Sequence, residues 1–470
     1  MRNRHRAVAV TVASALGIAL LMPGINPAQA ASKKKTTKKP PTTQAPTTVA
    51  ATAAPTTAAA AATTAAPTSA PAPAGDAALS LTGFDVGTKT IKIGFSGILT
   101  GAFQFLGNAQ RNSLQVEIDR INAAGGVGGA KLELVVRDDA LSAAKANDIA
   151  REFANDKSVG LVVGPAITGN FNAVRGVYED AKKVNCQPAV AGDAGFGTTL
   201  HYAFRAQDNG SDVVPFELKF LKEQGVGIVA LIYTNNATGK QFDKDIPAAA
   251  DKLGLVWAGT SFTQPSDQTH APQVKEAMDT FAQRKQLKPA IWIDNDANAA
   301  KTVAAAKAAG FKGIFVGGSG LGNYAIVDAG GAGMDDATFE APYQGALTRI
   351  PADQQPAGYA RHTQEVIKRF GFEKGTKEPV QQYLGTAIAA DCIVMYATAV
   401  AKAKSIDADK VVDAWETLKF PFGFLPSGVP ASFSKTDHET YQISDLWMWK
   451  WKKDDKGWYV ELARKSDSSK

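Results

Sequence analysis

The 470-residue chain lacks the short motifs that usually mark a catalytic centre. It has only two cysteines, and its histidines after residue 5 stand singly, without the close pairing of metal sites, at His201, His270, His362 and His438. Asp437-His438-Glu439 is interpreted as a solvated turn, and residues 317–321 lack the final glycine of a nucleophile elbow, because Leu321 stands there. No phosphate-binding glycine loop with lysine and no dinucleotide fingerprint is present. We therefore expect no enzyme, no bound metal and no cofactor.

The folded part of the chain also lacks an excess of positive charge. The formal net charge is +6, but residues 1–75 hold eight basic side chains and no acidic one, so residues 76–470 carry −2. Nucleic-acid binding needs a basic footprint on the fold itself. We expect no nucleic-acid partner.

The first thirty residues have the three parts of an export signal. Three arginines within the first six residues precede the apolar run 7–22, and Ala28-Gln29-Ala30 is a small-residue cleavage site. The apolar run is short for a membrane span. We expect cleavage after Ala30 and a periplasmic, cell-wall or extracellular protein. Because no cysteine lies near this site, a lipid anchor has no attachment point there.

Residues 31–87 are predicted to form a disordered tether. Most of them are Ala, Thr, Pro, Ser and Lys, a composition that cannot bury a core. Five lysines in this segment could touch an anionic wall or membrane surface. The two cysteines, Cys186 and Cys392, are compatible with one disulfide or with two buried thiols, and 206 residues separate them.

Strand patterns alternate with helical patterns along the rest of the chain, which predicts an α/β fold with parallel sheets covered on both faces. The length predicts two lobes. We expect the first lobe to comprise residues 88–206 and 338–418, and the second to comprise residues 207–337 and 419–465. The predicted strands are Ile91–Phe95, Leu132–Arg137, Gly160–Val163, Ala189–Ala191, Ile228–Tyr233, Ala290–Asp294 and Gly313–Val316. The predicted helices include Ala109–Ala123, Ala143–Asn155, Asn170–Val184, Gly239–Leu253, Gln273–Gln286, Ala297–Ala309, Val380–Ala403 and Ala408–Leu418. Trp447, Trp449 and Trp451 alternate, so they should share one buried or half-buried strand face.

Small, polar or glycine-rich loops follow the predicted strands, at the edge where open parallel sheets bind ligands. These loops are residues 97–107, 164–170, 192–199, 233–238, 294–296 and 317–320. One of them runs directly into a helix, where the Thr168 hydroxyl and free backbone N–H groups would form an anion cradle. A capping role for Thr168 is compatible with this binding role. Loops of two lobes facing across a cleft are the expected site for a small solute.

The segment Ile91–Asp139 contains IGFSGILTG followed by INAAGGVGGAKLELVVRDD, and this order resembles the opening of the branched-chain amino-acid binding proteins of ABC importers. With the later segments, the chain resembles the type I periplasmic-binding fold, in its leucine/isoleucine/valine-binding branch, from Ile91 to about Leu462. The resemblance implies two Rossmann-like lobes joined by three hinge strands. It also implies hinge closure around a solute and its presentation to a membrane permease.

The resemblance implies ligand contacts residue by residue. The hydroxyl that meets a ligand carboxylate is Thr168, and the aromatic position of the first loop falls at Leu106, beside Phe105. The third loop reads Asp193-Ala194-Gly195, which removes one hydroxyl and adds a carboxylate. The tyrosine that usually precedes a glycine in the second lobe is Thr238.

The acidic position that holds a ligand ammonium falls at Asn298. Because a buried ammonium without a carboxylate is costly, either Asp193 or Asp294 takes that role or the ligand has no α-ammonium. The complete set of expected ligand-binding residues is Thr100, Gln104, Phe105, Leu106, Ala166, Ile167, Thr168, Asp193, Ala194, Gly195, Tyr233, Asn236, Thr238, Asp294, Asn298 and Gly318.

Two functions remain open at this point. The first is a solute receptor of an ABC-type importer that captures a small polar solute, such as an amino acid or a related amide or carboxylate, with permease subunits as partners. The second is a cell-wall-associated interaction protein that reuses the fold and is held by its tether. The cleft loops favour the first function, whereas the lack of a lipid-attachment cysteine favours the second.

Overall fold

The computed structural model describes residues 75–467, with gaps at residues 102, 191, 193–194, 208–209, 296–297, 342, 344–349, 373–386, 441 and 456. The predicted signal peptide and residues 31–74 of the predicted tether lie outside the described residues. The prediction of disorder is wrong for residues 75–87, because Leu81, Phe84 and Val86 pack against the core of the first sheet. None of the helices in the described ranges is both long enough and apolar enough to cross a membrane.

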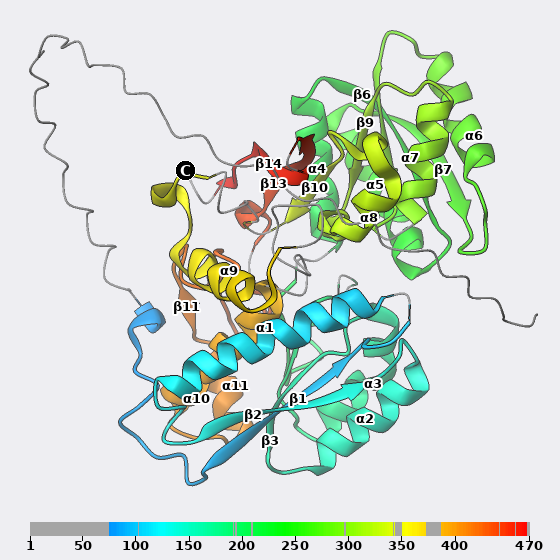
Figure 1. The fold of residues 1–470 in the computed structure, drawn as a ribbon. Coiled ribbons are helices and arrows are strands. Elements are labelled where there is room, and N and C mark those ends of the chain that lie inside the picture. The colour runs from blue at the N-terminus through cyan, green and yellow to red at the C-terminus, as the bar shows by residue number, and fades with distance from the viewer. Residues whose placement is uncertain are drawn as a thin grey trace, which may run out of the picture. The chain divides into compact units, whose positions relative to one another are not determined.

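The first sheet has five parallel strands in the order β2-β1-β3-β4-β5. Its strands are β1 (Thr90–Gly97), β2 (Lys131–Asp138), β3 (Val159–Val163), β4 (Asn185–Gln187) and β5 (Ala203–Arg205). The helices of this part are α1 (Gln104–Ala123), α2 (Ala143–Asn155), α3 (Thr168–Asp180), α9 (Ala357–Phe370), α10 (Ala387–Ala403) and α11 (Ala408–Trp415). Figure 1 shows this sheet with its helices.

Helices cover both faces of the first sheet because its strands are apolar on both sides. On one face, Ile93 and Phe95 pack with Leu114 and Ile118 of α1 and with much of α10. On the other face, Val162 packs with residues of α2 and α3, including Phe153, Phe171 and Val174. Leu114 and Ile118 therefore belong to the core face of α1.

The second sheet has seven strands in the order β14-β13-β10-β9-β8-β6-β7. Its parallel strands are β6 (Val226–Thr234), β7 (Val256–Thr263), β8 (Lys288–Ile293), β9 (Ile314–Gly317) and β10 (Thr338–Ala341). An antiparallel hairpin, β13 (Trp447–Asp454) and β14 (Gly457–Arg464), extends the sheet beyond β10.

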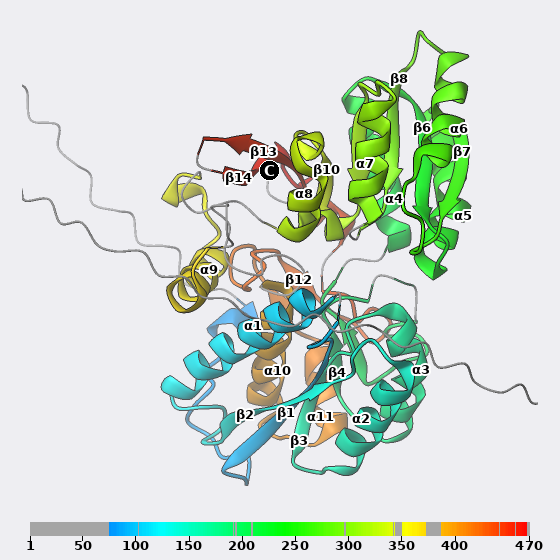
Figure 2. The same ribbon diagram turned by 45° about the vertical axis from the view of Figure 1, so that its right-hand side comes forward.

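Helices α4 (Gly210–Glu223) and α5 (Ala237–Leu253) pack on one face of this second sheet. Helices α6 (Ala271–Ala282), α7 (Asn298–Ala308) and α8 (Tyr324–Gly330) pack on the other face, and α7 and α8 lie side by side (Figure 2). The α/β architecture with parallel central sheets is thus confirmed.

Two segments pack with a different sheet from the one predicted. Residues 338–341 form β10 and pair with β9 and β13, because Phe339 and Ala341 belong to the core of the second sheet. The hairpin β11 (Lys419–Phe420) and β12 (Ala431–Ser432) packs with the core of the first sheet through Phe420 and Phe433. The predicted lobe limits therefore change at both places.

The strand predicted at Ala189–Ala191 was placed too late. The observed strand β4 is Asn185–Gln187, and its partners on β3 are Val162 and Val163. Pro188 follows β4 directly, and a proline has no N–H to donate to the next position of a ladder. The predicted helix from Val380 is described only from Ala387, where α10 begins.

The three alternating tryptophans of β13 are buried, as predicted. Trp447 is 5% exposed, and Trp449 and Trp451 are fully buried in the core of the second sheet. The ring of Tyr343 meets both Trp447 and Trp449 edge-on, and the indole N–H of Trp451 donates to the carbonyl of Leu321 at 2.7 Å. These rings form a core face and leave no surface for a ligand to stack on.

Cys186 and Cys392 form a disulfide, which decides between the two states that the sequence left open. The two sulfur atoms are 2.01 Å apart, and both side chains are fully buried. Cys186 lies on β4 and Cys392 on α10, so the bond ties the first sheet to a helix that follows 206 residues later.

The double variant Cys186→Ser/Cys392→Ser should lose about 2–5 kcal/mol of unfolding free energy, because the cross-link restricts the unfolded chain. Denaturant unfolding with and without reductant measures this loss. Reductant should bring the parent protein to the level of the variant and leave the variant unchanged. Equal stability of the parent in both conditions would show that the bond does not stabilise the fold.

A buried polar network attaches α9 to α1. His362 Nδ1 lies 2.9 Å from Glu117 Oε1, and His362 Nε2 lies 3.0 Å from Ser113 Oγ. Burial alone would raise the pKa of Glu117, but the hydrogen bond and charge of His362, with the charges of Arg120 and Arg361, lower it from 4.5 to about 2. Ser113 is only 1% exposed, so this serine–histidine–glutamate row is closed to a substrate.

Glu117→Gln should destabilise the protein by up to about 3 kcal/mol at pH 7. The folded-state pKa of Glu117 is lowered, so its stabilising effect is present above pH 4.5 and is lost as the pH falls towards 2. Unfolding measured from pH 7 to pH 2 should show the variant and the parent converging. Asp119→Asn is the control, because Asp119 on the same helix pairs with Arg369 at the surface and should matter little.

Candidate functional site

The carboxyl edge of the first sheet brings together several predicted binding residues. Leu106 of α1, Ala166 of the loop after β3, and Ala189 form a small buried apolar cluster, with Phe105 and Ile167 packed against it. These residues come from three segments that follow three different strands. Gln104 is the first residue of α1 and directly precedes Phe105 in the sequence. Its side chain is exposed.

Thr168 is the first residue of α3, and its side chain does not cap the helix. The cap position is Ile167, which makes no side-chain cap hydrogen bond. Instead, the Thr168 hydroxyl oxygen accepts a hydrogen bond from the N–H of Gly192 at 3.3 Å. Thr168 is only half-buried, and its hydroxyl proton remains a donor at the start of a helix, where free N–H groups favour an anion.

Thr100 holds the first loop to the end of β2. Its hydroxyl donates to Asp138 Oδ2 at 2.7 Å, and the N–H of Leu99 donates to Oδ1 at 2.9 Å. Burial acts to raise the pKa of Asp138, but hydrogen bonds from Thr100, Leu99 and Ala140 lower it overall. The conformation of the first loop therefore depends on an ionised Asp138.

Asp139 is a buried carboxylate that the sequence reading did not include in the site. Ser96 Oγ on β1 donates to its Oδ2 at 3.2 Å, and Asn170 Nδ2 on α3 donates to its Oδ1 at 3.5 Å. Burial raises the pKa of Asp139, against hydrogen bonds from Leu141 and Ser96. The sequence shows two aspartates at the end of β2. It does not show that Asp139 accepts a hydrogen bond from Asn170 of α3.

Arg205 donates hydrogen bonds to the backbone where the third loop begins. Its guanidinium is fully buried at the end of β5, and Nη1 donates to the carbonyl of Gly192 at 3.0 Å and to that of Val190 at 3.4 Å. The same guanidinium forms an ion pair with Glu439. Gly195 begins the following turn, and its carbonyl accepts the N–H of Thr199. Asp193 and Ala194 lie outside the described residues.

The prediction that residues 437–439 form a solvated turn is wrong for His438. Its ring is fully buried and stacks on Phe204, with 4.2 Å between the ring centroids. Nδ1 lies 3.0 Å from the carbonyl of Ala203, and Nε2 lies 3.3 Å from Glu416. The buried Phe204 supplies an apolar surface that the local sequence around His438 does not reveal.

In the second sheet, Asp294 and Asn298 meet at the end of β6. Asp294 is fully buried, and its Oδ1 accepts the N–H of Thr234 at 2.8 Å. Asn298 Nδ2 donates to Thr234 Oγ1 at 3.1 Å. These two predicted residues therefore both contact Thr234, which lies in the predicted loop 233–238 but was not among the expected ligand-binding residues.

The other predicted residues of the loop after β6 shape the backbone. Asn236 caps α5, because its Oδ1 accepts the N–H of Gly239 at 2.8 Å. The ring of Tyr233 is buried and meets Phe242 edge-on, with 5.4 Å between centroids. Thr238 lies half-buried in the first turn of α5.

Gly318 lies where the loop after β9 approaches other chain segments closely. A Cβ atom placed at Gly318 would lie 2.6 Å from Asn295 Nδ2, so a larger residue would displace this side chain. Next to it, Glu340 of β10 is 1% exposed and accepts the N–H of Ser319 at 2.6 Å. Glu340 was not among the expected residues, because residues 338–341 were predicted to belong to the first lobe.

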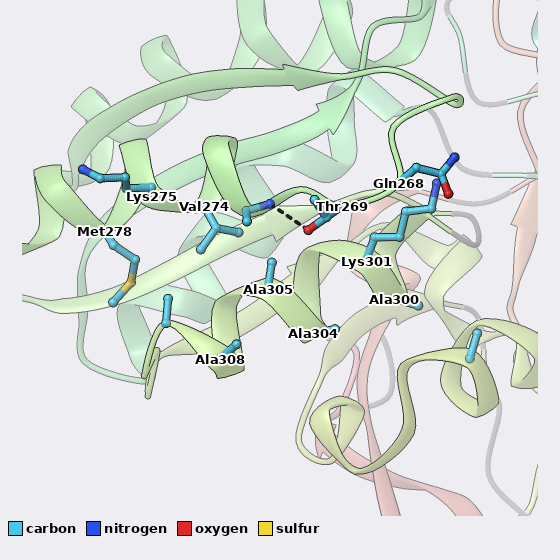
Figure 3. Close-up of a pocket in the computed structure, with 13 residues that line it drawn as sticks. Gln268, Thr269, Val274, Lys275, Met278, Ala300, Lys301, Ala304, Ala305 and Ala308 are labelled. Atoms are coloured by element: carbon cyan, nitrogen blue, oxygen red, sulfur yellow. Dashed lines mark hydrogen bonds between the residues drawn. The ribbon is translucent and has the colours of Figure 1, made fainter.

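A large groove lies between α6 and α7. Its volume is about 800 Å³, and it runs along these two helices on the face of the second sheet that they cover. Figure 3 shows Ala304, Ala305 and Ala308 of α7 on one side and Val274 and Met278 of α6 on the other. Its lining is mostly apolar and has none of the predicted binding residues. Within the described ranges, no group of three or more His, Cys, Asp or Glu side chains is arranged to hold a metal ion.

Two parallel sheets covered by helices, each with polar loops at its carboxyl edge, define the class as a type I periplasmic-binding fold. A periplasmic binding protein type 1 from Bordetella pertussis superposes with a TM-score of 0.68 at 18% identity, covering 79% of this chain and 100% of that one. A branched-chain amino acid transporter substrate binding protein from Streptococcus pneumoniae, in complex with isoleucine, gives 0.65 at 21% identity, covering 80% and 100%. Two lobes built around these sheets are thus established.

The chain belongs to the periplasmic binding protein family, whose sequence model matches residues 90–456. The leucine-, isoleucine-, valine-, threonine- and alanine-binding protein of Pseudomonas aeruginosa is 25% identical over 380 residues, which cover 78% of this chain and 95% of that protein. A Leu/Ile/Val-binding protein homolog of Brucella suis is 23% identical over 376 residues, covering 77% and 88%. The resemblance to the leucine/isoleucine/valine-binding branch is confirmed.

Arg205→Gln should reduce the unfolding free energy by about 3 kcal/mol, because it leaves Glu439 half-buried without its partner and the carbonyls of the third loop without a charged donor. Denaturant unfolding measures the loss, and hydrogen exchange should show faster exchange at the N–H of Gly192. Arg137→Gln is a matched control, because Arg137 pairs with Glu152 at 2.6 Å at the surface and should change stability by less than about 1 kcal/mol. Equal effects of the two changes would contradict the supporting role of Arg205.

Proposed function

We propose that this protein is the exported receptor of an ABC-type importer and captures a small polar solute, an amino acid or a related amide or carboxylate, between its two lobes. The main support is the family match combined with polar loops at the carboxyl edges of both sheets. Relatives with this fold are named for amino acids that they bind.

The first lobe offers two chemically different surfaces to such a solute. Thr168 and the first N–H groups of α3 suit a carboxylate, which a helix N-terminus attracts. The adjacent cluster of Phe105, Leu106, Ala166 and Ile167 suits an aliphatic side chain. An α-amino acid with an apolar side chain carries both groups on one carbon.

The ammonium of such a solute needs a carboxylate partner. Asp294 is fully buried and its Oδ1 already accepts the N–H of Thr234, so we assign it the role of positioning Thr234 and Asn298. Asp193 is then the proposed partner of the ammonium. The remaining proposed contacts are Thr100, Gln104, Ala194, Gly195, Tyr233, Asn236, Thr238 and Gly318.

Capture would proceed by closure of the two lobes about the segments that connect them. A solute that contacts loops of both lobes stabilises the closed state, because the open state offers it only half of these contacts. The closed form would then be recognised by the permease subunits at the membrane. This mechanism needs no bond to form or break in the solute.

A thermal-shift screen of the full chain tests the proposal. Leucine, isoleucine, valine, threonine or alanine should raise the Tm, since a ligand that binds only the folded state stabilises it. Thr168→Val should weaken binding by about tenfold or more, because it removes a hydrogen bond to a charged group, whereas Thr168→Ser keeps the hydroxyl and should bind nearly as well. No response to amino acids, amides or carboxylic acids would sink the proposal.

Cell-wall retention through the tether is a second, compatible proposal. It rests on the five lysines of residues 31–87 and on export with cleavage after Ala30. Co-sedimentation of the mature chain with isolated cell walls tests it, against a chain that begins at residue 75. Equal sedimentation of the two chains would assign any wall contact to the folded body instead.

A further inference from the structure

A polar pocket lies at the opposite edge of the second sheet, where its parallel strands begin. Its volume is about 410 Å³, within the range of small-molecule sites. It is lined by the starts of β8, β9 and β10, by the ends of α4 and α7, and by part of the β13–β14 hairpin. The solute loops follow the other ends of these strands, so this pocket is separate from the solute site.

Lysines from four separate segments converge on this pocket. Lys288 begins β8, and Lys307 lies in the last turn of α7. Lys312 lies in the loop before β9, and Lys450 lies on β13. Only tertiary folding brings these residues together, because the first and the last are 162 positions apart in sequence. This convergence concentrates positive charge on a body whose net charge is −2.

Three of these lysines form no ion pair with a carboxylate in the part of the chain that the structure describes. Lys288 donates to the carbonyl of Gln224 at 2.9 Å, and Lys307 lies over the ring of Phe315, 5.6 Å from its centroid. Lys312 forms no hydrogen bond or ion pair with the residues that the structure describes. Each ammonium has three N–H donors, so all three lysines keep donors for a ligand.

The acidic side chains near the pocket are engaged by other lysines. Lys452 lies 3.5 Å from Asp335 and 3.2 Å from Asp336, and Lys450 lies 3.4 Å from Glu461. Four lysines and two aspartates line the pocket, which leaves a local net charge of +2. Both aspartates pair with Lys452, which lies outside the lining, so they do not cancel the positive charge of the pocket.

We propose that this pocket binds a phosphate group. A phosphate carries up to two negative charges and offers three acceptor oxygens, which matches three lysines with remaining donors and the amide of Gln224. Free phosphate presents this chemistry in full, and the phosphodiester of an anionic lipid headgroup presents it with one negative charge and two free oxygens. The proposal does not depend on the solute site.

Calorimetric titration of the full chain with inorganic phosphate, and flotation with phosphatidylglycerol or phosphatidylcholine vesicles, distinguish these sources. Saturable binding of free phosphate without vesicle binding assigns the pocket to a soluble phosphate. Binding to phosphatidylglycerol but not phosphatidylcholine vesicles assigns it to a headgroup. In either case, Lys307→Gln/Lys312→Gln should weaken binding at least about fivefold, because it removes two of the three available ammonium groups.

Lys157→Gln/Lys410→Gln is the matched control, because it removes the same charge from exposed positions of the first lobe and should leave binding unchanged. The thermal stability of both variants, measured in parallel, confirms that they fold. The proposal is overturned if neither phosphate nor anionic vesicles bind, or if the two double variants weaken binding equally. The response to amino acids should be the same in both variants, so failure here and failure of the solute proposal are separable.

Discussion

Buried polar side chains hold the loops at the carboxyl edges of both sheets. Asp139 and Arg205 do so in the first sheet, and Asp294 and Glu340 do so in the second, each at most 1% exposed. A buried polar group without hydrogen-bond partners costs about 1–3 kcal/mol, so the backbone groups around each one must keep their positions. The loops that would contact a solute are thereby fixed within each lobe.

This arrangement separates the residues that support the site from those that would touch a ligand. Asp294 and Arg205 bind backbone groups, and they determine where Thr234 and Gly192 lie. Thr168 is different, because it is half-buried at a helix start and keeps a donor while it accepts from Gly192. A rigid support with few exposed polar groups is what a receptor needs if its lobes move as bodies and the solute supplies the remaining contacts.

The strength of the sequence pattern decided how far the fold and site could be predicted. The strand–loop–helix pattern from Ile91 onward predicts β1, α1 and β2 because apolar periodicity and turn residues agree there. Strand β5 has only three residues and α4 contains Pro215, so neither has a clear local signal. The contacts of Glu340 with Ser319 and of Asp294 with Thr234 join segments far apart in sequence, so no local pattern predicts them.

The sequence by itself determined the α/β class, the family, the apolar faces of the helices, and the loops that follow the strand ends, because these follow from local periodicity and from motifs in order. Only the tertiary structure decided that Cys186 bonds to Cys392, that β10 joins the second sheet, that His438 is buried, and that four lysines share one pocket. These features depend on contacts between residues separated by tens to hundreds of positions. Such contacts are set by how whole layers pack, and no short stretch of sequence contains that information.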